Sequence, residues 1–192
     1  MKLVIISGAT RKNGNTAAIL KELARGFDDV RSFDLYSMDI KGCSGCLYCK
    51  SHDGCSIKDD MTPIYEAIEE ADALIIGSPI YMCEETACTK AFIERTFAFL
   101  DNKNRDGGRP IYVPKLRPGK KAVAMFLSGS PLGRRQFRTV TKNYEQHFKT
   151  QGFKDSRTFI LAGVHPGMDA LKETKVIKTI AKARSFLQDE GQ

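Results

Sequence analysis

No apolar run in this sequence of 192 residues approaches the roughly 20 residues that a membrane-spanning helix requires. The first apolar run, Leu-Val-Ile-Ile, is too short for the core of a signal peptide, and no cleavage site follows it. We therefore expect a cytoplasmic protein with no membrane contact, in a compartment where thiols stay reduced. Internal repeats and low-complexity tracts are also absent, and the length suits one domain over residues 1–192.

Several binding signatures are missing as well. Without a G-x-G-x-x-G fingerprint, a Rossmann-type dinucleotide cradle is not expected, and without a Walker motif neither is nucleoside triphosphate hydrolysis. The net charge of +7 suggests nucleic acid, but no arginine-rich arm or interleaving of aromatic and basic residues appears, so we expect no such partner. The basic residues between 103 and 138 would form a solvated face, or attract an acidic redox partner or a phosphorylated nucleotide.

Four of the six cysteines lie in one short segment, at about residues 42–58, with the spacing C-x2-C-x2-C-x5-C. Two-residue gaps allow neighbouring thiolates to converge on a small centre, and Gly45 and Gly54 permit the tight backbone that this requires. Iron–sulfur clusters use such spacing; here the last gap is longer than in the ferredoxin run, and Ser56 stands in place of proline. The pattern predicts one [4Fe–4S] cluster bound by Cys43, Cys46, Cys49 and Cys55.

Other uses of these thiols stay open. Structural zinc sites usually pair two C-x2-C knuckles across a longer loop, so the tandem spacing fits zinc less well. Disulfides are an alternative, but no feature marks a secreted chain. Free thiols without any cluster are a further alternative. Cys83 and Cys88 are distant in sequence and are typical of small buried residues rather than of ligands.

Short runs of valine, isoleucine and leucine alternate along the chain with segments of helical periodicity. Strands are predicted at residues 3–7, 30–36, 73–77, 121–127 and 157–161. Helices are predicted at residues 16–26, from residue 59, and at residues 85–100, 134–150 and 168–188. A long loop is predicted at residues 101–119. This alternation predicts an α/β fold, a doubly wound five-stranded parallel sheet with helices on both faces.

Ligands of doubly wound sheets bind outside the carboxyl ends of the strands. Residues 7–16, 78–82 and 128–131 follow predicted strands, are rich in small, hydroxyl or proline residues, and would meet there in one crevice. The first of these segments leads into a helix, whose N-terminal N–H groups can bind a single phosphate such as that of FMN. A plain turn and helix cap would explain its asparagines, glycine and threonine, but not Arg11. Its side-chain donors are Thr10, Arg11, Asn13, Asn15 and Thr16.

Five motifs occur in order: S-G-x-x-R-x-x-G-N-T at residues 7–16, the four-cysteine run, D-D-M at 59–61, G-S-P-I-Y at 77–81 and K-A-F-I-x-R-T at 90–96. Together they resemble the iron–sulfur flavoproteins, which belong to the NADPH-dependent FMN reductase-like branch of the flavodoxin-like folds. The resemblance extends from Lys2 to about Phe97 and, more weakly, through the last two strands.

This resemblance implies a flavodoxin-like fold, a compact [4Fe–4S] cluster on the four cysteines and a homo-oligomer, either a dimer or a tetramer. It implies FMN bound by the first loop, through Ser7, Thr10, Arg11, Asn13, Gly14, Asn15 and Thr16. It places close to the isoalloxazine ring Pro79, Ile80, Tyr81, Met82 and Ser128. Two departures from the family pattern concern the flavin: Ala9-Thr10 replaces the usual Ser-Pro, and Met82-Cys83-Glu84 replaces a common aromatic, glycine and asparagine.

An FMN-dependent oxidoreductase is the function that we predict. In this hypothesis a one-electron donor, such as an acidic ferredoxin-like protein, reduces the cluster, which passes electrons to FMN and on to an acceptor. The cofactors carry the chemistry, so no catalytic side chain is required. His52, His147 and His165 are expected to be structural or solvated.

Three other functions stay open. NAD(P)H can serve as the hydride donor in an FMN or quinone reductase without a working cluster, with the basic segment 103–121 holding its phosphates. A flavodoxin-like electron carrier is disfavoured because carriers that pair with basic partners are expected to be acidic, whereas this chain is basic. A zinc-stabilised interaction domain would leave unexplained the loop predicted to bind phosphate, residues 7–16, which we call the phosphate loop.

Overall fold

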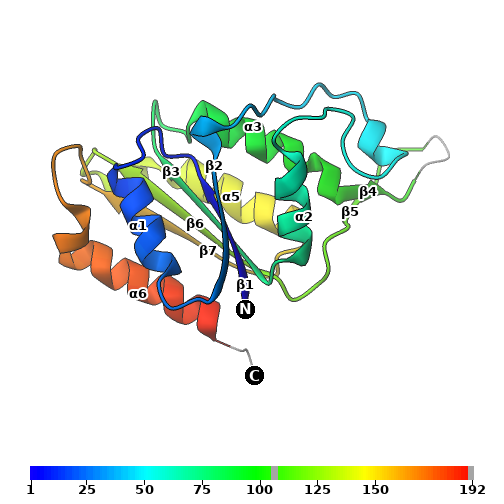
Figure 1. Ribbon diagram of the computed structural model, residues 1–192. Coiled ribbons are helices and arrows are strands. Elements are labelled where there is room, and N and C mark those ends of the chain that lie inside the picture. The colour runs from blue at the N-terminus through cyan, green and yellow to red at the C-terminus, as the bar shows by residue number, and fades with distance from the viewer. Residues whose placement is uncertain (105–107, 190–192) are drawn as a thin grey trace.

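The computed structural model describes residues 1–104 and 108–189 of the chain (Figure 1). Its main sheet has five parallel strands in the order β2-β1-β3-β6-β7. The strands are β1 (Lys2–Ser7), β2 (Asp29–Asp34), β3 (Ala73–Pro79), β6 (Lys121–Ser128) and β7 (Asp155–Ala162). From β1 the chain winds first to one edge and then across to the other, which is the doubly wound topology of flavodoxin-like folds. The predicted fold class is confirmed.

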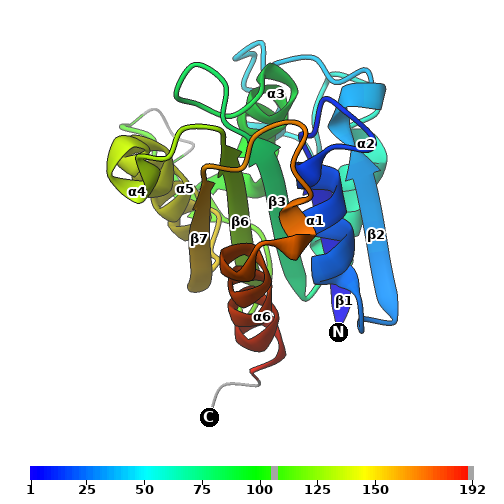
Figure 2. The same cartoon turned by 90° about the vertical axis from the view of Figure 1, so that its left-hand side faces the viewer.

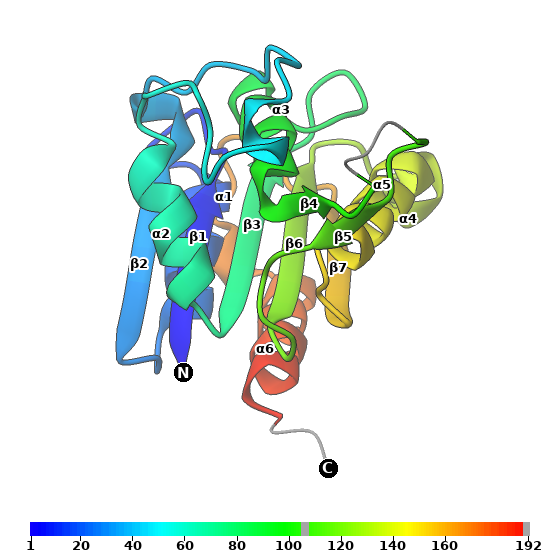
Figure 3. The ribbon, with the colours of Figure 1, turned by 90° about the vertical axis from the view of Figure 1, so that its right-hand side faces the viewer.

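Helices cover both faces of this sheet. On one face lie α1 (Asn15–Ala24) and α6 (Thr174–Gln188), as Figure 2 shows. On the opposite face, visible in Figure 3, lie α2 (Thr62–Glu70), α3 (Ala87–Arg95) and α5 (Arg138–Thr150). Each face therefore has its own apolar core between helices and strands.

The inner strands are apolar on both sides because they contribute to both cores. In β1, Leu3 and Ile5 belong to the core beneath α1 and α6, whereas Val4 and Ile6 belong to the core on the other face. The four side chains are between 0% and 3% exposed. By contrast, the edge strand β2 carries an exposed Asp29-x-Arg31-Ser32 stretch. Its weaker apolar pattern follows from its having a neighbouring strand on one side only.

Residues 101–119, which were predicted as a loop, contain a second, antiparallel sheet. It pairs β4 (Leu100–Asn102) with β5 (Tyr112–Pro114), so that Leu100 faces Pro114 in the register. Strands of three residues are too short for an alternating pattern to be recognised in the sequence. Arg105 of the predicted basic segment lies outside the described residues.

Several predicted boundaries were wrong. The strand predicted over residues 30–36 ends at Asp34, whose carboxylate accepts the Tyr36 N–H and starts a short 3₁₀ turn. The helix predicted over 85–100 ends at Arg95 and continues as a 3₁₀ turn over Thr96–Phe99. Residues 134–150 are divided at Phe137 between α4 (Gly133–Gln136) and α5.

The last helix begins at Thr174, later than the predicted residue 168, and is preceded by a 3₁₀ turn at Ala170–Lys172. Met168 and Leu171 still pack against the core beneath α1 and α6. They continue the apolar periodicity of α6 although neither belongs to an α-helix, which explains the early predicted start.

All strands of the main sheet point the same way, so their carboxyl ends lie along one edge, at the top of Figures 2 and 3. The loops after β1 and β3 and the chain after β2 gather at this edge. Among the described residues, no helix has the length and apolar character needed to cross a membrane.

One half-buried titratable group, His147, makes the stability of the fold depend on pH. Burial, together with the smaller effect of the nearby positive charge of Lys90, lowers the pKa of His147 from 6.5 to about 4. The unfolded chain therefore binds a proton on this side chain at a higher pH than the folded chain does. Stability is fully present above pH 6.5 and is lost as the pH falls from 6.5 towards about 4.

We predict that His147→Gln makes the fold less sensitive to acid. Between about pH 7.5 and pH 4.5, this one group should cost the wild-type protein about 2 kcal/mol of unfolding free energy, after allowance for its partial exposure. Urea unfolding at the two pH values measures the difference. His165→Gln, at an exposed histidine, is the control and should behave like the wild type. An equal acid loss in His147→Gln and the wild type would contradict the prediction.

Candidate functional site

The loop between β1 and α1 ends at a helix N-terminus that no side chain caps. The residue before α1 is Gly14, whose backbone is extended and which offers no side-chain oxygen. The N–H groups of the first turn, beginning at Asn15, are therefore available to a ligand at the positive end of the helix dipole. Such a terminus is a common binding site for phosphate.

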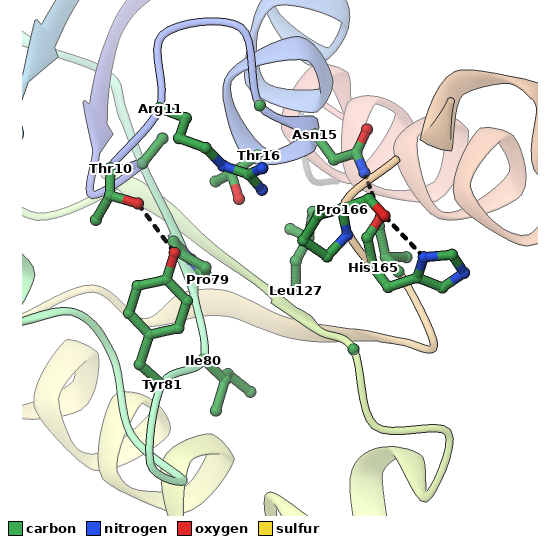
Figure 4. Close-up of a pocket in the computed structure, with 14 residues that line it drawn as sticks. Thr10, Arg11, Asn15, Thr16, Pro79, Ile80, Tyr81, Leu127, His165 and Pro166 are labelled. Atoms are coloured by element: carbon green, nitrogen blue, oxygen red, sulfur yellow. Dashed lines mark hydrogen bonds between the residues drawn. The ribbon is translucent and has the colours of Figure 1, made fainter. Parts of the chain in front are cut away.

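Short backbone bonds fix the loop above the sheet. At its start, the Gly8 N–H donates to the Gly77 carbonyl of β3 at 2.7 Å. At its end, the Gly14 N–H donates to the Arg11 carbonyl at 3.0 Å and closes a turn. Because of this turn the Arg11 side chain lies beside the helix terminus, and Figure 4 shows its guanidinium extending towards Thr16.

The chain that follows β3 forms a second wall opposite this loop. Pro79, Ile80 and Tyr81 line the cleft between them, and the Ile80 N–H donates to the Leu127 carbonyl at 2.7 Å. The Tyr81 hydroxyl lies 2.9 Å from the Thr10 hydroxyl, within hydrogen-bonding distance, so the two walls touch at the rim (Figure 4). The phosphate loop and the wall after β3 are thus brought together as the sequence predicts.

A third wall comes from the chain after β7, which the sequence analysis did not include. Val164, His165 and Pro166 line the cleft, together with Gly129 after β6. The Asn15 amide joins this wall to α1, since its Nδ2 donates to the His165 carbonyl at 3.1 Å and its Oδ1 accepts the Ala170 N–H at 3.3 Å. Gly129 belongs to the predicted segment 128–131, and the rule that ligands lie beyond strand carboxyl ends, applied to the fifth strand, would also have found Val164, His165 and Pro166.

We call this hollow the carboxyl-edge cleft. Of the predicted flavin-binding residues, eight line it: Thr10, Arg11, Gly14, Asn15, Thr16, Pro79, Ile80 and Tyr81. Four do not. Ser7 accepts the Ala9 N–H, Ser128 accepts the Ser130 N–H, and Asn13 is exposed. Met82 is 95% exposed and, like Cys83, has a positive φ, so its side chain lies out in solvent at the rim.

The cysteine loop, residues 42–58, follows β2 and passes over α3 towards β4 (Figure 1). One arginine holds both of its ends. Arg95 donates to the Lys41 carbonyl at 3.0 Å and to the Ile57 carbonyl at 3.2 Å, and it forms a two-pronged ion pair with Asp59 at 2.6 and 3.0 Å. The side chains of this pair are 0% and 3% exposed.

Burial by itself raises the pKa of Asp59, but hydrogen bonds from Arg95 and from the backbone N–H groups of Lys41 and Met61 lower it below its usual value. From the sequence, a helix is predicted to start at Asp59, where the positive end of the helix dipole favours an acidic residue. Its main role in the structure is instead to pair with Arg95. This pair fixes the spacing of the two ends of the loop.

The middle of the loop is fixed by a buried lysine. Lys50 is 8% exposed, and its ammonium group donates to the carbonyls of Phe97 and Leu100. The same group lies 3.7 Å from the centre of the Phe97 ring, in a cation–π contact. Desolvation lowers the pKa of Lys50. The loop is therefore anchored at three points despite its few regular elements.

The four thiols of the loop do not meet at one point. In residues 1–104 and 108–189, no group of three or more cysteine, histidine or acidic side chains could hold a metal ion, and the six cysteines are free. Cys43 and Cys46 are exposed, whereas Cys49 and Cys55 are half-buried. A hydrogen bond with Ser56, at 3.2 Å, and weaker ones with the Tyr48 backbone and the Ser44 side chain together lower the pKa of Cys46 to about 7.

Residues 1–136 match the family model for NADPH-dependent FMN reductases. The chain belongs to this family. The resemblance seen in the sequence motifs is confirmed, and with it the prediction of a flavin-dependent oxidoreductase family. The matched region includes the phosphate loop, the cysteine loop and the wall after β3.

Curated relatives in this family include iron–sulfur flavoproteins. One from Archaeoglobus fulgidus is 38% identical over 103 residues, which are 52% of this chain and 47% of the relative. Another, from Methanocaldococcus jannaschii, is 34% identical over 137 residues, which are 69% of this chain and 64% of the relative. The chain thus spans about half to two thirds of the length of these relatives.

Solved structures share the fold at low sequence identity. An NAD(P)H:quinone oxidoreductase from Methanothermobacter marburgensis superimposes with a TM-score of 0.73 at 16% identity, covering 100% of this chain and 99% of the other. An FMN-dependent NADH-azoreductase from Bacillus anthracis, solved with FMN, gives 0.66 at 15% identity, covering 98% and 100%. At these identities, the likeness concerns the fold alone.

We predict that Asp59→Asn destabilises the protein and releases the cysteine loop. Removing one partner of a buried ion pair leaves the Arg95 charge uncompensated, which should lower the unfolding free energy by about 3 kcal/mol. Urea unfolding measures the stability, and limited proteolysis within residues 42–58 measures the release. Asp72→Asn, in the half-exposed pair of Asp72 with Arg117, is the matched control and should cost at most about 1 kcal/mol. Equal effects of the two substitutions would refute the anchoring role.

Proposed function

We propose that this chain is an FMN-dependent oxidoreductase whose cofactor occupies the carboxyl-edge cleft. The observation that carries the proposal is the uncapped N-terminus of α1, which opens into a cleft lined by Arg11 and by Thr10 and Thr16. Membership of the NADPH-dependent FMN reductase family supports the same cofactor. The residues present therefore fit FMN.

The phosphate of FMN would bind at the first turn of α1. The backbone N–H groups there supply neutral donors, and the Arg11 guanidinium supplies a charged one. Thr16 adds a hydroxyl near the same point. Thr10 stands where the family usually has proline. Its hydroxyl lies within hydrogen-bonding distance of the Tyr81 hydroxyl and so connects the phosphate side of the cleft to the ring side.

The isoalloxazine ring would lie against the apolar wall formed by Pro79, Ile80 and Leu127. When bound, FMN supplies one-electron and two-electron transfer. The task of these side chains is to orient the ring and to exclude water from the face that they cover. Tyr81 is 49% exposed at the rim, so it can contact both the ring and an incoming substrate.

We predict that Arg11→Gln weakens FMN binding about tenfold to a hundredfold, because a charge-assisted hydrogen bond to phosphate is lost. The dissociation constant is measured by the quenching of flavin fluorescence on titration of the apoprotein. Lys12→Gln is the matched control, since Lys12 is an exposed neighbour of like charge that does not line the cleft. An equal loss of affinity in both variants would mean that only net charge matters.

We further propose that the cysteine loop binds an iron–sulfur cluster through Cys43, Cys46, Cys49 and Cys55. The C-x2-C-x2-C-x5-C spacing supports this, as do the relatives named iron–sulfur flavoproteins. The thiols as they are arranged do not fit one centre. Cluster binding would require residues 42–58 to rearrange between the ends that Arg95 holds. The position of the cluster relative to FMN depends on that rearrangement.

We predict that Cys49→Ala abolishes iron and sulfide binding and leaves FMN bound, because Cys49 is the central thiol of the run and lies outside the cleft lining. Metal, sulfide and flavin analysis of anaerobically purified protein measures all three. Cys83→Ala is the control and should retain iron, since Cys83 lies outside the four-cysteine run. Unchanged iron in Cys49→Ala would exclude this ligand set, and zinc in place of iron in the wild-type protein would exclude the iron–sulfur cluster.

A second candidate is an NAD(P)H-dependent FMN or quinone reductase without a cluster. The match of residues 1–136 to the family model for NADPH-dependent FMN reductases favours it, and a Bacillus subtilis relative described as a putative NAD(P)H-dependent FMN-containing oxidoreductase is 30% identical over 95 residues. Anaerobic mixing separates the two candidates. Rapid bleaching of the flavin by NAD(P)H alone supports the reductase, and bleaching only by reduced ferredoxin supports the cluster-fed route.

We also propose that the protein is a homo-oligomer, a dimer or a tetramer, and that its donor is acidic. Family resemblance supports the first proposal, and the net charge of +7 supports the second, since opposite charge speeds encounter. Light scattering on the purified protein tests the first. A donor reaction whose rate falls steeply with added salt tests the second.

A further inference from the structure

Three buried hydroxyls lie beneath the phosphate loop, at the join between β3 and α3. Ser78 and Thr89 are 0% exposed and Thr86 is 4% exposed. None of the three lines the carboxyl-edge cleft. Their hydrogen bonds nevertheless reach two of its three walls, the phosphate loop and the wall after β3.

Thr86 makes the bond to the phosphate loop. Its hydroxyl donates to the carbonyl of Gly8 at 3.0 Å, across 78 positions of sequence. Thr86 is also the N-cap residue of α3, a position where a threonine hydroxyl commonly accepts an N–H from its own helix. It makes no such cap bond here. The hydroxyl serves the neighbouring loop instead of its helix.

Thr89 fixes the orientation of the Thr86 hydroxyl. The two oxygens lie 2.8 Å apart. A hydroxyl has one hydrogen, and Thr86 uses its own for the Gly8 carbonyl, so Thr89 must donate to Thr86. Thr89 also limits how Gly8 can sit, because a Cβ added at Gly8 would lie 1.8 Å from the Thr89 hydroxyl oxygen. The start of the loop rests directly on this cluster.

Ser78 makes the bonds to the wall after β3. Its hydroxyl oxygen accepts the Thr86 N–H at 3.1 Å and donates to the Pro79 carbonyl at 2.8 Å. The cluster therefore joins Gly8, where the phosphate loop starts, to Pro79, where the ring-side wall starts. FMN has a phosphate at one end and a ring at the other, so its binding requires the phosphate loop and the ring-side wall at a fixed separation.

We propose that Thr86 is a positioning residue for the phosphate of FMN, acting through the Gly8 carbonyl. This rests on the proposed FMN site. Both backbone polar groups of Gly8 are held, its N–H by the Gly77 carbonyl and its carbonyl by the Thr86 hydroxyl. Two attachments fix the direction in which the loop leaves the sheet. Without the bond from Thr86, the peptide group that contains the Gly8 carbonyl can rotate. The donors of residues 10–16 then no longer converge on one point.

The test compares FMN with riboflavin, which has the same ring but no phosphate. Thr86→Val keeps the side-chain shape and removes the hydroxyl, so the dissociation constant of FMN should rise about tenfold, while that of riboflavin should change less than about twofold. Thr86→Ser restores the hydroxyl and should restore FMN affinity. Thr141→Val is the matched control, because Thr141 is a buried threonine whose hydroxyl donates locally, to the carbonyl of Phe137 just before α5.

Unchanged FMN affinity in Thr86→Val, or equal loss of FMN and riboflavin, would overturn the positioning role. Ser78→Ala provides a second test if Thr86→Val does not fold, since it removes the bonds that join Thr86 to the wall after β3. It should also weaken the binding of FMN more than that of riboflavin. Wild-type protein that binds riboflavin and FMN equally would overturn the proposed phosphate site itself. Wild-type preference for FMN that survives in both variants overturns the role of the hydroxyl cluster alone.

Discussion

The common direction of the five strands is the constraint on which the rest of this structure depends. A parallel strand can be reached only by a crossover, so helices cover the two faces and every strand opens into a loop at the same edge. The phosphate loop after β1, the wall after β3 and the chain after β7 are distant in sequence and meet there. The cysteine loop after β2 starts from that edge too. Binding groups are concentrated where the sheet leaves backbone and side chains accessible.

Helix α3 connects the two candidate redox regions. At its first end, Thr86 holds the start of the phosphate loop through the Gly8 carbonyl. At its last residue, Arg95 holds both ends of the cysteine loop and pairs with Asp59. The body of the helix packs against the sheet through Phe92, which is fully buried. One rigid element thus sets the position of both loops relative to the sheet, although the two loops are not adjacent in the sequence.

Local patterns allowed the sheet and the phosphate loop to be predicted. Apolar runs identify buried strands, and a glycine and hydroxyl segment between a strand and a helix identifies an anion site, because each signal lies within about ten residues. What the sequence could not reveal depends on contacts between distant residues. The Thr86 hydroxyl is 78 positions from its acceptor, and the Asn15 amide is 150 positions from the His165 carbonyl. No local pattern indicates that Lys50 is buried, yet its ammonium group lies over the Phe97 ring, which is 47 positions away.

The exposed residues of β2 have a consequence for solubility. An edge strand presents unpaired backbone groups that can recruit a strand from another molecule and start a growing aggregate. In β2 the positions Asp29, Arg31 and Ser32 face solvent, so a second strand docking there would have to bury two charges. The outermost strand thereby discourages open-ended association at that edge, while the apolar inner strands remain out of reach behind it.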